Sequence, residues 1–183
     1  MKTTLLILLS TLANIAVSAT SLRPLSLDTL FSSADYVAIV QIQSGAMVEG
    51  EGARYHATVT ILIKGDKLAK EIDFGPFAGL GIGSYYMVFL QRDSAGRFMI
   101  MFQGFGSFAL NTTHLNKDPM YLARHTRMDD VAKILTSHII LPAALKSYPT
   151  DDSKRVLSDD RIWGAKWVKQ EDLINYLQHL PNR

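Results

Sequence analysis

The stretch R-Y-H-A-T-V-T-I-L-I-K, from Arg54 to Lys64, alternates apolar and polar side chains almost without interruption. A period of two is typical of a β-strand with one buried face, because successive side chains of a strand point to opposite sides. The sequence therefore predicts a strand here that presents one apolar face to a core. The residues expected on that face are Tyr55, Ala57, Val59, Ile61 and Ile63.

Further strands are predicted on both sides of this one. β-Branched and aromatic residues favour an extended, half-buried strand before it, and the glycines of 45–52 favour a flexible loop in between. After the turn signal Lys64-Gly65-Asp66, a short strand and then a hairpin are expected. The predicted strands cover residues 36–44, 54–64, 71–74, 85–91, 97–103 and 107–110.

Helical periodicity flanks this β-rich region. Ser26 suits the N-cap of a brief helix whose buried face is formed by Leu27, Leu30 and Phe31. The sequence thus predicts that a short helix precedes the first strand.

The C-terminal part is expected to be mainly helical. One helix is predicted from Asp129 or Asp130 through Ile140, and a closing helix covers 170–180. Strands followed by helices predict an α+β protein whose strands close into a small barrel.

Residues 1–19 have the pattern of a cleavable secretory signal. An apolar run from Leu5 to Val17 follows one basic residue, and small side chains precede a predicted cleavage between Ala19 and Thr20. The run is shorter than the roughly 20 residues needed to span a bilayer. An uncleaved membrane anchor is the less favoured alternative. We therefore expect an exported protein, periplasmic or secreted, with no membrane segment in its mature chain.

Charge and cysteine content exclude several functions. The mature chain would carry 18 basic and 17 acidic residues, because only one charged residue, Lys2, lies in the predicted signal. A nearly neutral chain does not favour nucleic acid, whose binding depends on a positive surface. The absence of cysteine excludes disulfides, thiolate catalysis and thiolate metal ligands.

Three segments together are similar to a known family. They are Ala34-Asp35-Tyr36-Val37-Ala38-Ile39-Val40, then Thr58-Val59-Thr60-Ile61-Leu62-Ile63-Lys64-Gly65, then Gly83-Ser84-Tyr85-Tyr86-Met87-Val88-Phe89-Leu90. In this order they resemble the netrin-like modules, the OB-fold group that includes the tissue inhibitors of metalloproteinases, and especially their uncharacterised bacterial exported relatives. The resemblance covers roughly 25–110.

The resemblance implies a five- to six-stranded antiparallel OB-like β-barrel with C-terminal helices. The expected organisation is a signal peptide over 1–19, the OB-like barrel over 20–115, and a helical C-terminal extension over 116–183 packed on the barrel. The family's inhibitors chelate a protease zinc ion through an N-terminal cysteine, which this chain does not have. The resemblance therefore carries no inhibitory residue over to this sequence.

His114, Asp118 and His125 are the candidate metal ligands, since they are metal-capable side chains within a short span. Imidazole and carboxylate groups suit zinc or a similar ion. The span contains a proline and no His-Glu-x-x-His pattern that would fix the geometry. Surface or helix-capping roles are favoured over a metal site, and no cofactor is expected.

Two other segments invite a catalytic or nucleotide-binding interpretation. The glycines of 79–83 lead into a strand, whereas a dinucleotide fingerprint needs a helix after it. Ser84 lacks the Gly-x-Ser-x-Gly frame of a nucleophile elbow. His56 lies on the polar face of the clearest strand, where a solvated position is favoured over a catalytic one. A flexible connection and a solvated strand face are the preferred interpretations.

The acidic pairs and the aromatic residues are the remaining candidates for binding-site residues. Asp151-Asp152 and Asp159-Asp160 lack the glycine-centred loop of a calcium site, so a solvated loop is favoured. Trp163 and Trp167 are expected to pack over the barrel. The remaining aromatic residues are expected to fill the barrel rather than to stack on bases. They are Tyr85, Tyr86, Phe89, Phe98, Phe102, Phe105 and Phe108.

The sequence favours a non-enzymatic binding module whose ligand is an unidentified protein or small molecule. Its contact surfaces are expected on the loops 45–53 and 75–83, since loops on a rigid scaffold commonly carry function. The alternatives are an enzyme, for instance a hydrolase, with His56, His114 or His125 as base, and a protease inhibitor, which the missing cysteine disfavours.

Overall fold

The fold is given by a computed structural model that describes residues 23–66, 70–77, 79–102, 105–111, 131–149 and 164–181. The predicted signal and its cleavage site between Ala19 and Thr20 lie outside these residues.

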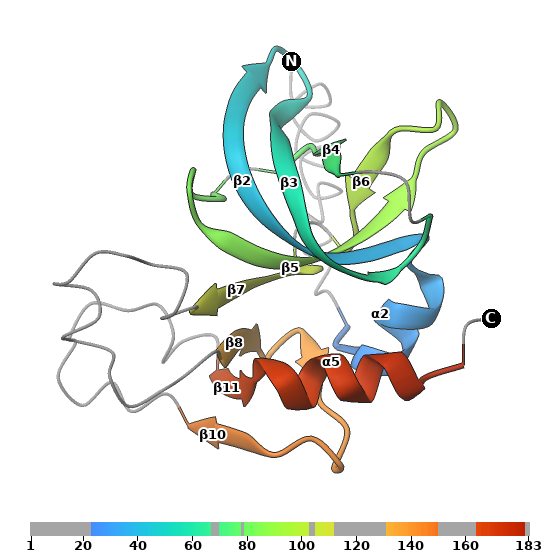
Figure 1. The fold of residues 1–183 in the computed structure, drawn as a ribbon, viewed down its shortest axis with the longest axis vertical. Helices are drawn as coiled ribbons and strands as arrows, with labels where there is room; N and C mark the ends of the chain where they lie inside the picture. Colours follow the sequence, from blue (N-terminus) through green and yellow to red (C-terminus); the bar gives the residue numbers. More distant parts are fainter. Residues whose placement is uncertain are drawn as a thin grey trace, which may run out of the picture.

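Five strands form a closed barrel (Figure 1). β2 pairs with both β3 and β5, β3 pairs with β4, and β5 also pairs with β6. The ring closes where Phe74 and Phe98 pair in parallel, so the barrel is mixed and not wholly antiparallel as predicted. The strands are β2 (Tyr36–Val48), β3 (Gly52–Lys64), β4 (Glu71–Phe74), β5 (Tyr85–Arg92) and β6 (Phe98–Ile100).

The sheet continues beyond the barrel through β5. The order from that strand outward is β5-β7-β8-β11-β10, and a separate parallel pair joins β1 to β9. Within the described ranges, two helices, α2 (Leu27–Ser33) and α5 (Gln170–His179), complete the α+β fold that the sequence predicted. The additional strands are β1 (Leu25–Ser26), β7 (Ser107–Asn111), β8 (Val131–Leu135), β9 (Ile139–Ile140), β10 (Ser147–Pro149) and β11 (Ala165–Lys169).

The prediction of a helix over 129–140 is wrong. Residues 131–135 form β8, a turn follows, and 139–140 form β9. β8 lies between β7 and β11, and its neighbours on both sides satisfy its backbone groups. Its apolar residues fit a helical stripe, but a strand buried on both faces produces a similar run. Among the described residues after 130, four strands and one helix are present, so the described part of the expected helical extension is mainly β-structure.

Both helices match their predicted patterns. The Ser26 hydroxyl caps α2 by accepting a hydrogen bond from the backbone N–H of Thr29, at 3.1 Å. The three apolar residues predicted for its inner face are buried. In α5, Leu173 and Leu177 lie fully inside, one turn apart on the face that contacts the sheet.

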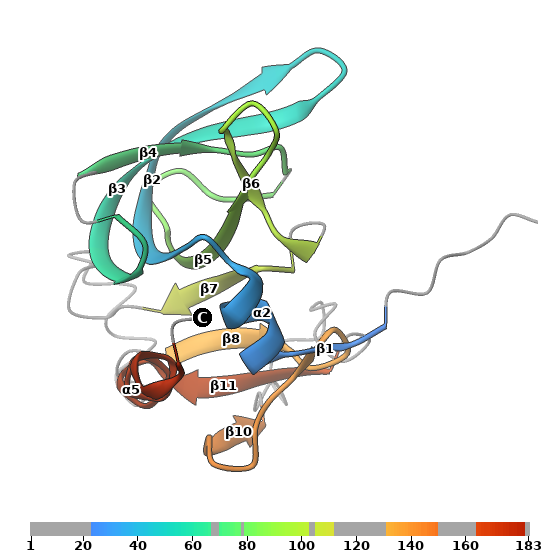
Figure 2. The same cartoon turned by 90° about the vertical axis from the view of Figure 1, so that its right-hand side faces the viewer.

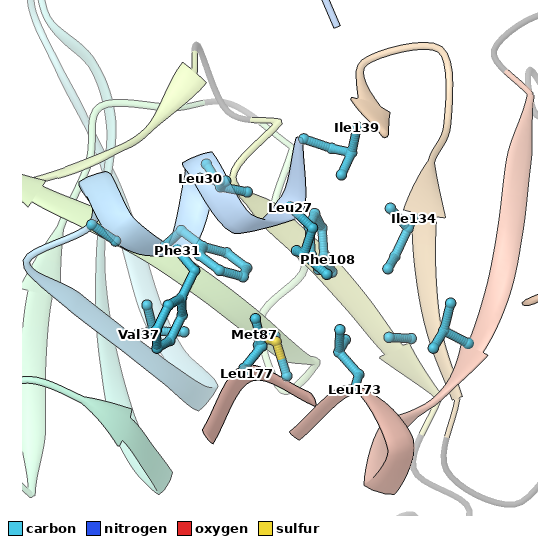
Figure 3. Close-up of a cluster of buried hydrophobic side chains, with 14 of the residues drawn as sticks. Leu27, Leu30, Phe31, Val37, Met87, Phe108, Ile134, Ile139, Leu173 and Leu177 are labelled. Carbon is cyan, nitrogen blue, oxygen red and sulfur yellow. The ribbon is translucent and has the colours of Figure 1, made fainter. Parts of the chain in front are cut away.

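Two apolar clusters lie on opposite sides of β2. We call the interior of the barrel the barrel core, and the cluster between the barrel, α2, α5 and β8 the outer core (Figure 3). Alternate residues of β2 enter each of them: Tyr36, Ala38 and Val40 the barrel core, Val37 and Ile39 the outer core. The strand predicted to be half-buried is thus buried on both faces, in keeping with its unbroken apolar run.

A β-bulge divides β3 between the two cores. Val59 pairs with Val40 and Ile61 pairs with Ile39, so Thr60 has no partner in this register. One extra residue reverses the side to which later side chains point. Tyr55 and Ala57 belong to the barrel core, whereas Ile61 and Ile63 pack against the outer core. The prediction of a single apolar face therefore holds only up to Val59.

The loop predicted over 45–52 is mostly strand. β2 runs on to Val48 and β3 begins at Gly52, which leaves residues 49–51 as the turn of a long hairpin. The hairpin projects past the rest of the barrel (Figure 2).

Replacing an isoleucine of β2 by alanine should destabilise the protein, whichever of the two cores its side chain occupies. Ile39→Ala removes a side chain from the outer core and Ile42→Ala one from the barrel core, and both side chains are at most 1% exposed. We expect each change to lower the free energy of unfolding by about 2–5 kcal/mol, measured by urea denaturation. Ile82→Ala is the control, because Ile82 is 68% exposed and its loss should change little. A change below about 1 kcal/mol for either core variant would contradict this assignment.

Gly65→Ala should destabilise the protein more than Gly83→Ala. Both glycines have positive φ, +114° and +81°, so both substitutions strain the backbone. Only at Gly65 would the new Cβ meet a buried ring, at 2.5 Å from Tyr36, whereas Gly83 has open space. We expect Gly65→Ala to cost at least about 1 kcal/mol more, because overpacking adds about 1–3 kcal/mol. Thermal unfolding of the two variants compares them, and equal midpoints would contradict the packing at Tyr36.

Candidate functional site

A band of polar side chains covers the outer face of β3 and β4. Because side chains alternate along β3, Arg54, His56 and Thr58 stay outside while their neighbours enter the barrel core. The register of β4 sets Asp73 opposite His56 and Glu71 opposite Thr58. We use the name polar face for these residues together with Ser44 of β2 and the turn residues Glu51, Asp93 and Arg97.

His56 lies between two carboxylates on the polar face. Its Nδ1 is 2.9 Å from Oδ1 of Asp73, and its Nε2 is 3.6 Å from Oε2 of Glu71. The hydrogen bond with Asp73 raises the pKa of His56, and the negative charges of Asp73 and Glu71 add to this while desolvation opposes it. The protonated imidazole therefore stabilises the fold fully below the ordinary histidine pKa of about 6.5, and this contribution disappears as the pH rises through the folded-state pKa.

Ion pairs connect the two turns at the other end of the polar face. Arg54 Nη2 lies 2.7 Å from Glu51 Oε2, and Arg97 reaches both Glu51, at 3.5 Å, and Asp93, at 2.7 Å. Hydrogen bonds from the side chains of Arg54 and Arg97 lower the pKa of Glu51. The backbone N–H of Arg97, followed by its side chain, lowers the pKa of Asp93. Exposed ion pairs contribute only about 0–1 kcal/mol each to stability. Their main effect is to hold the hairpin turn of β2 and β3 beside the turn between β5 and β6.

The loop before β5 is tied to the barrel. Leu80 is buried against the barrel core, and its backbone N–H donates to the hydroxyl of Tyr55 at 3.2 Å. The N–H of Gly81 donates to the hydroxyl of Tyr86 at 2.9 Å. Leu80 of the loop predicted as a contact surface thus packs on the scaffold, whereas residues 81–83 stay exposed. The glycines of 79–83 lead directly into β5, as the sequence indicated.

Several predicted site residues fall outside the described part of the chain. His114, Asp118 and His125 lie there, as do both acidic pairs and Trp163. Within the described ranges, no group of three His, Cys, Asp or Glu residues could hold a metal ion. Trp167 is partly buried in β11.

The clustered aromatic residues are mostly core residues, but the barrel interior holds only some of them. Tyr86 and Phe98 pack with the barrel core. Four others pack in the outer core, and Phe105 instead stacks on the buried ring of His138, with ring centroids 3.7 Å apart. The four in the outer core are Tyr85, Phe89, Phe102 and Phe108.

Sequence reasoning missed a second polar group, on α5. Asp172, Asn175, Tyr176 and His179 follow the spacing i, i+3, i+4, i+7, so they share one helix face. They border a hollow of about 420 Å³ whose other side is formed by residues 144–146. The helical period of the predicted closing helix contains the signal for this face, because these four polar residues recur at the same spacing as its apolar stripe.

Comparison with known proteins gives no family assignment: no family model matches the chain, and no curated protein matches it significantly. No helix among the described residues has the length and apolar character needed to cross a membrane.

Asp73→Ala should lower the pKa of His56. The variant removes both the hydrogen bond and the charge that favour the protonated imidazole. A pH titration of the imidazole signals by NMR measures the change. Glu49→Ala is the matched control, because Glu49 is an exposed acidic residue with no ion pair to another described residue. An unchanged His56 pKa in Asp73→Ala would contradict the observed pairing.

Proposed function

We propose that this protein is an exported, non-enzymatic binding module built on an OB-like barrel, and that it binds a protein partner through the polar face. The single observation that carries this proposal is the polar face itself, where two turns and two strands hold charges of both signs in fixed positions.

The strand order supports the OB-like assignment. The first barrel strand, β2, pairs with the second and the fourth, and the third and fifth strands pair in parallel. These pairings fit the five-stranded Greek-key barrel of an OB-fold. Such barrels commonly bind ligands on the face of their second and third strands and on the adjoining turns. In this chain those elements are β3, β4 and the turns at 49–51 and 93–97, which carry the polar face.

The charges of the polar face favour a protein partner. Arg54 and Arg97 lie among four carboxylates, so the face carries both signs with an excess of negative charge; the carboxylates are those of Glu51, Glu71, Asp73 and Asp93. A polyanion such as nucleic acid needs a positive surface, which this face does not offer. A partner segment with charges of both signs can exchange ion pairs with it, and complementary charges give specificity to such contacts.

One observation favours an enzyme as the second candidate. The bond of 2.9 Å between His56 and Asp73 is the arrangement of a base with its orienting carboxylate. Glu71 faces the other ring nitrogen, and the imidazole is 39% exposed, so water reaches the group that would act as base. A binding role fits this open position better, because catalytic pairs depend on the exclusion of water.

A photo-crosslinking amino acid that replaces Ser44 should capture the partner. Ser44 is exposed and lies opposite His56 on the polar face. We expect a discrete protein adduct in the exported fraction of the native host, identified by mass spectrometry. The same residue at Lys166, an exposed position on β11, should give no such adduct.

The double variant Arg54→Glu/Arg97→Glu tests the charges directly. Reversing both should lower the affinity for the captured partner by at least about tenfold, measured with purified proteins. Absence of a Ser44 adduct, an identical adduct at Lys166, or unchanged affinity would each overturn the proposal. A hydrolytic activity lost in His56→Ala would support the enzyme instead.

A further inference from the structure

The hollow beside α5 lies between this helix and a loop segment. The segment 144–146 forms one side, and the face of α5 with Asp172, Asn175, Tyr176 and His179 forms the other. Leu173 and Leu177 fix the rotation of the helix, since both are fully buried in the outer core. Leu145, on the opposite side, is anchored in the same core. The polar residues of α5 are therefore held toward the hollow by the packing behind them.

Two of these side chains are fixed by hydrogen bonds that determine what they can offer a ligand. The hydroxyl of Tyr176 donates to Oδ1 of Asp28 at 2.7 Å, and burial together with this carboxylate raises the pKa of Tyr176 to about 12. The phenol stays protonated and bonded to α2, so the ring is the part of Tyr176 that remains for a ligand. His179 Nδ1 donates to the backbone oxygen of Asn175 at 2.6 Å, so Nε2 is the acceptor of the neutral ring.

The two other side chains keep their hydrogen-bonding capacity. Within the described part of the chain, the carboxylate of Asp172 and the amide of Asn175 have no hydrogen-bond or ion-pair partner. The hollow thus combines the anchored ring of Tyr176 with planar side-chain groups that accept hydrogen bonds, donate them, or do both. Leu145 and Ala144 add apolar contact area on the far side.

We propose that this hollow binds a saccharide unit. A sugar ring presents apolar C–H groups that can lie against the Tyr176 ring, and vicinal hydroxyls that both donate to and accept from Asp172, Asn175 and His179. A small zwitterion would depend on ion pairs with Asp172 and Lys146. In an exposed site such a pair changes affinity by less than about fivefold, which does not hold a ligand of this size. The site is separate from the polar face and does not depend on the function assigned to that face.

Tetrasaccharides provide the test. Chitotetraose, cellotetraose and maltotetraose are titrated separately into the isotope-labelled full-length mature protein, and the backbone amide signals are followed by NMR. We expect at least one of them to shift the signals of 144–146 and of 172–179 selectively. Glycine and glutamate are titrated as zwitterion probes. Absence of any saccharide-dependent shift, or shifts produced by glycine or glutamate instead, would overturn the proposal.

Four variants locate the site. Asp172→Ala and Asn175→Ala should each weaken binding by about tenfold, since each removes hydrogen bonds to sugar hydroxyls while alanine preserves the helix. Tyr176→Phe keeps the ring and loses only the bond to Asp28, so it should bind within about threefold of the original protein. Tyr176→Leu removes the ring and should bind about tenfold more weakly.

The matched control is Gln178→Ala, an exposed residue of the same helix that does not line the hollow. It should bind like the original protein. Equal affinity in Asp172→Ala and Gln178→Ala, with both variants giving well-dispersed spectra, would show that the saccharide binds elsewhere and would contradict the site.

Discussion

The burial of β2 on both faces is the constraint on which the rest of the structure depends. Tyr36, Ala38 and Val40 fill the barrel, while Val37 and Ile39 contact the outer core, and all five are at most 2% exposed. A strand that belongs to two cores couples them, because the barrel cannot lose β2 without exposing the surface that α2 and α5 cover. β5 repeats this arrangement, with Val88 and Leu90 inside the barrel and Met87 and Phe89 outside it.

This double burial also decides where polar groups can gather. The outer core covers β2, β5 and the second half of β3, so the first half of β3 and β4 are left as a barrel face that can carry charges. The same outer core holds α5 by its apolar stripe and turns the opposite stripe toward residues 144–146. The polar face and the hollow are thus two consequences of one packing arrangement, although they offer different chemistry.

The sequence predicted the strands and helices correctly where one periodicity dominates. The predictions failed where strand pairing with distant residues competes with the local pattern. Regular alternation identified Tyr55 and Ala57 as inward residues, and helical spacing identified Leu27 and Leu30. The bulge at Thr60 was not predictable, because it depends on the register with β2. In place of the helix predicted over 129–140, residues 131–135 form β8, since pairing of this strand on both sides outweighs a helix-like spacing. His56 and Asp73 are 17 residues apart, and only strand register brings them together, so their pairing was not predictable from the sequence. The polar stripe of α5, in contrast, can be recognised from the helical spacing of its residues.

Native-state hydrogen exchange tests most directly whether β2 joins the two cores into one cooperative unit. The amides of β2 between Val37 and Val40 should exchange only through global unfolding, and those around Leu177 in α5 should give the same free energy within about 1 kcal/mol. A markedly lower free energy for α5, with the barrel amides still protected at the global value, would show that the outer core opens independently and would contradict the coupling through β2.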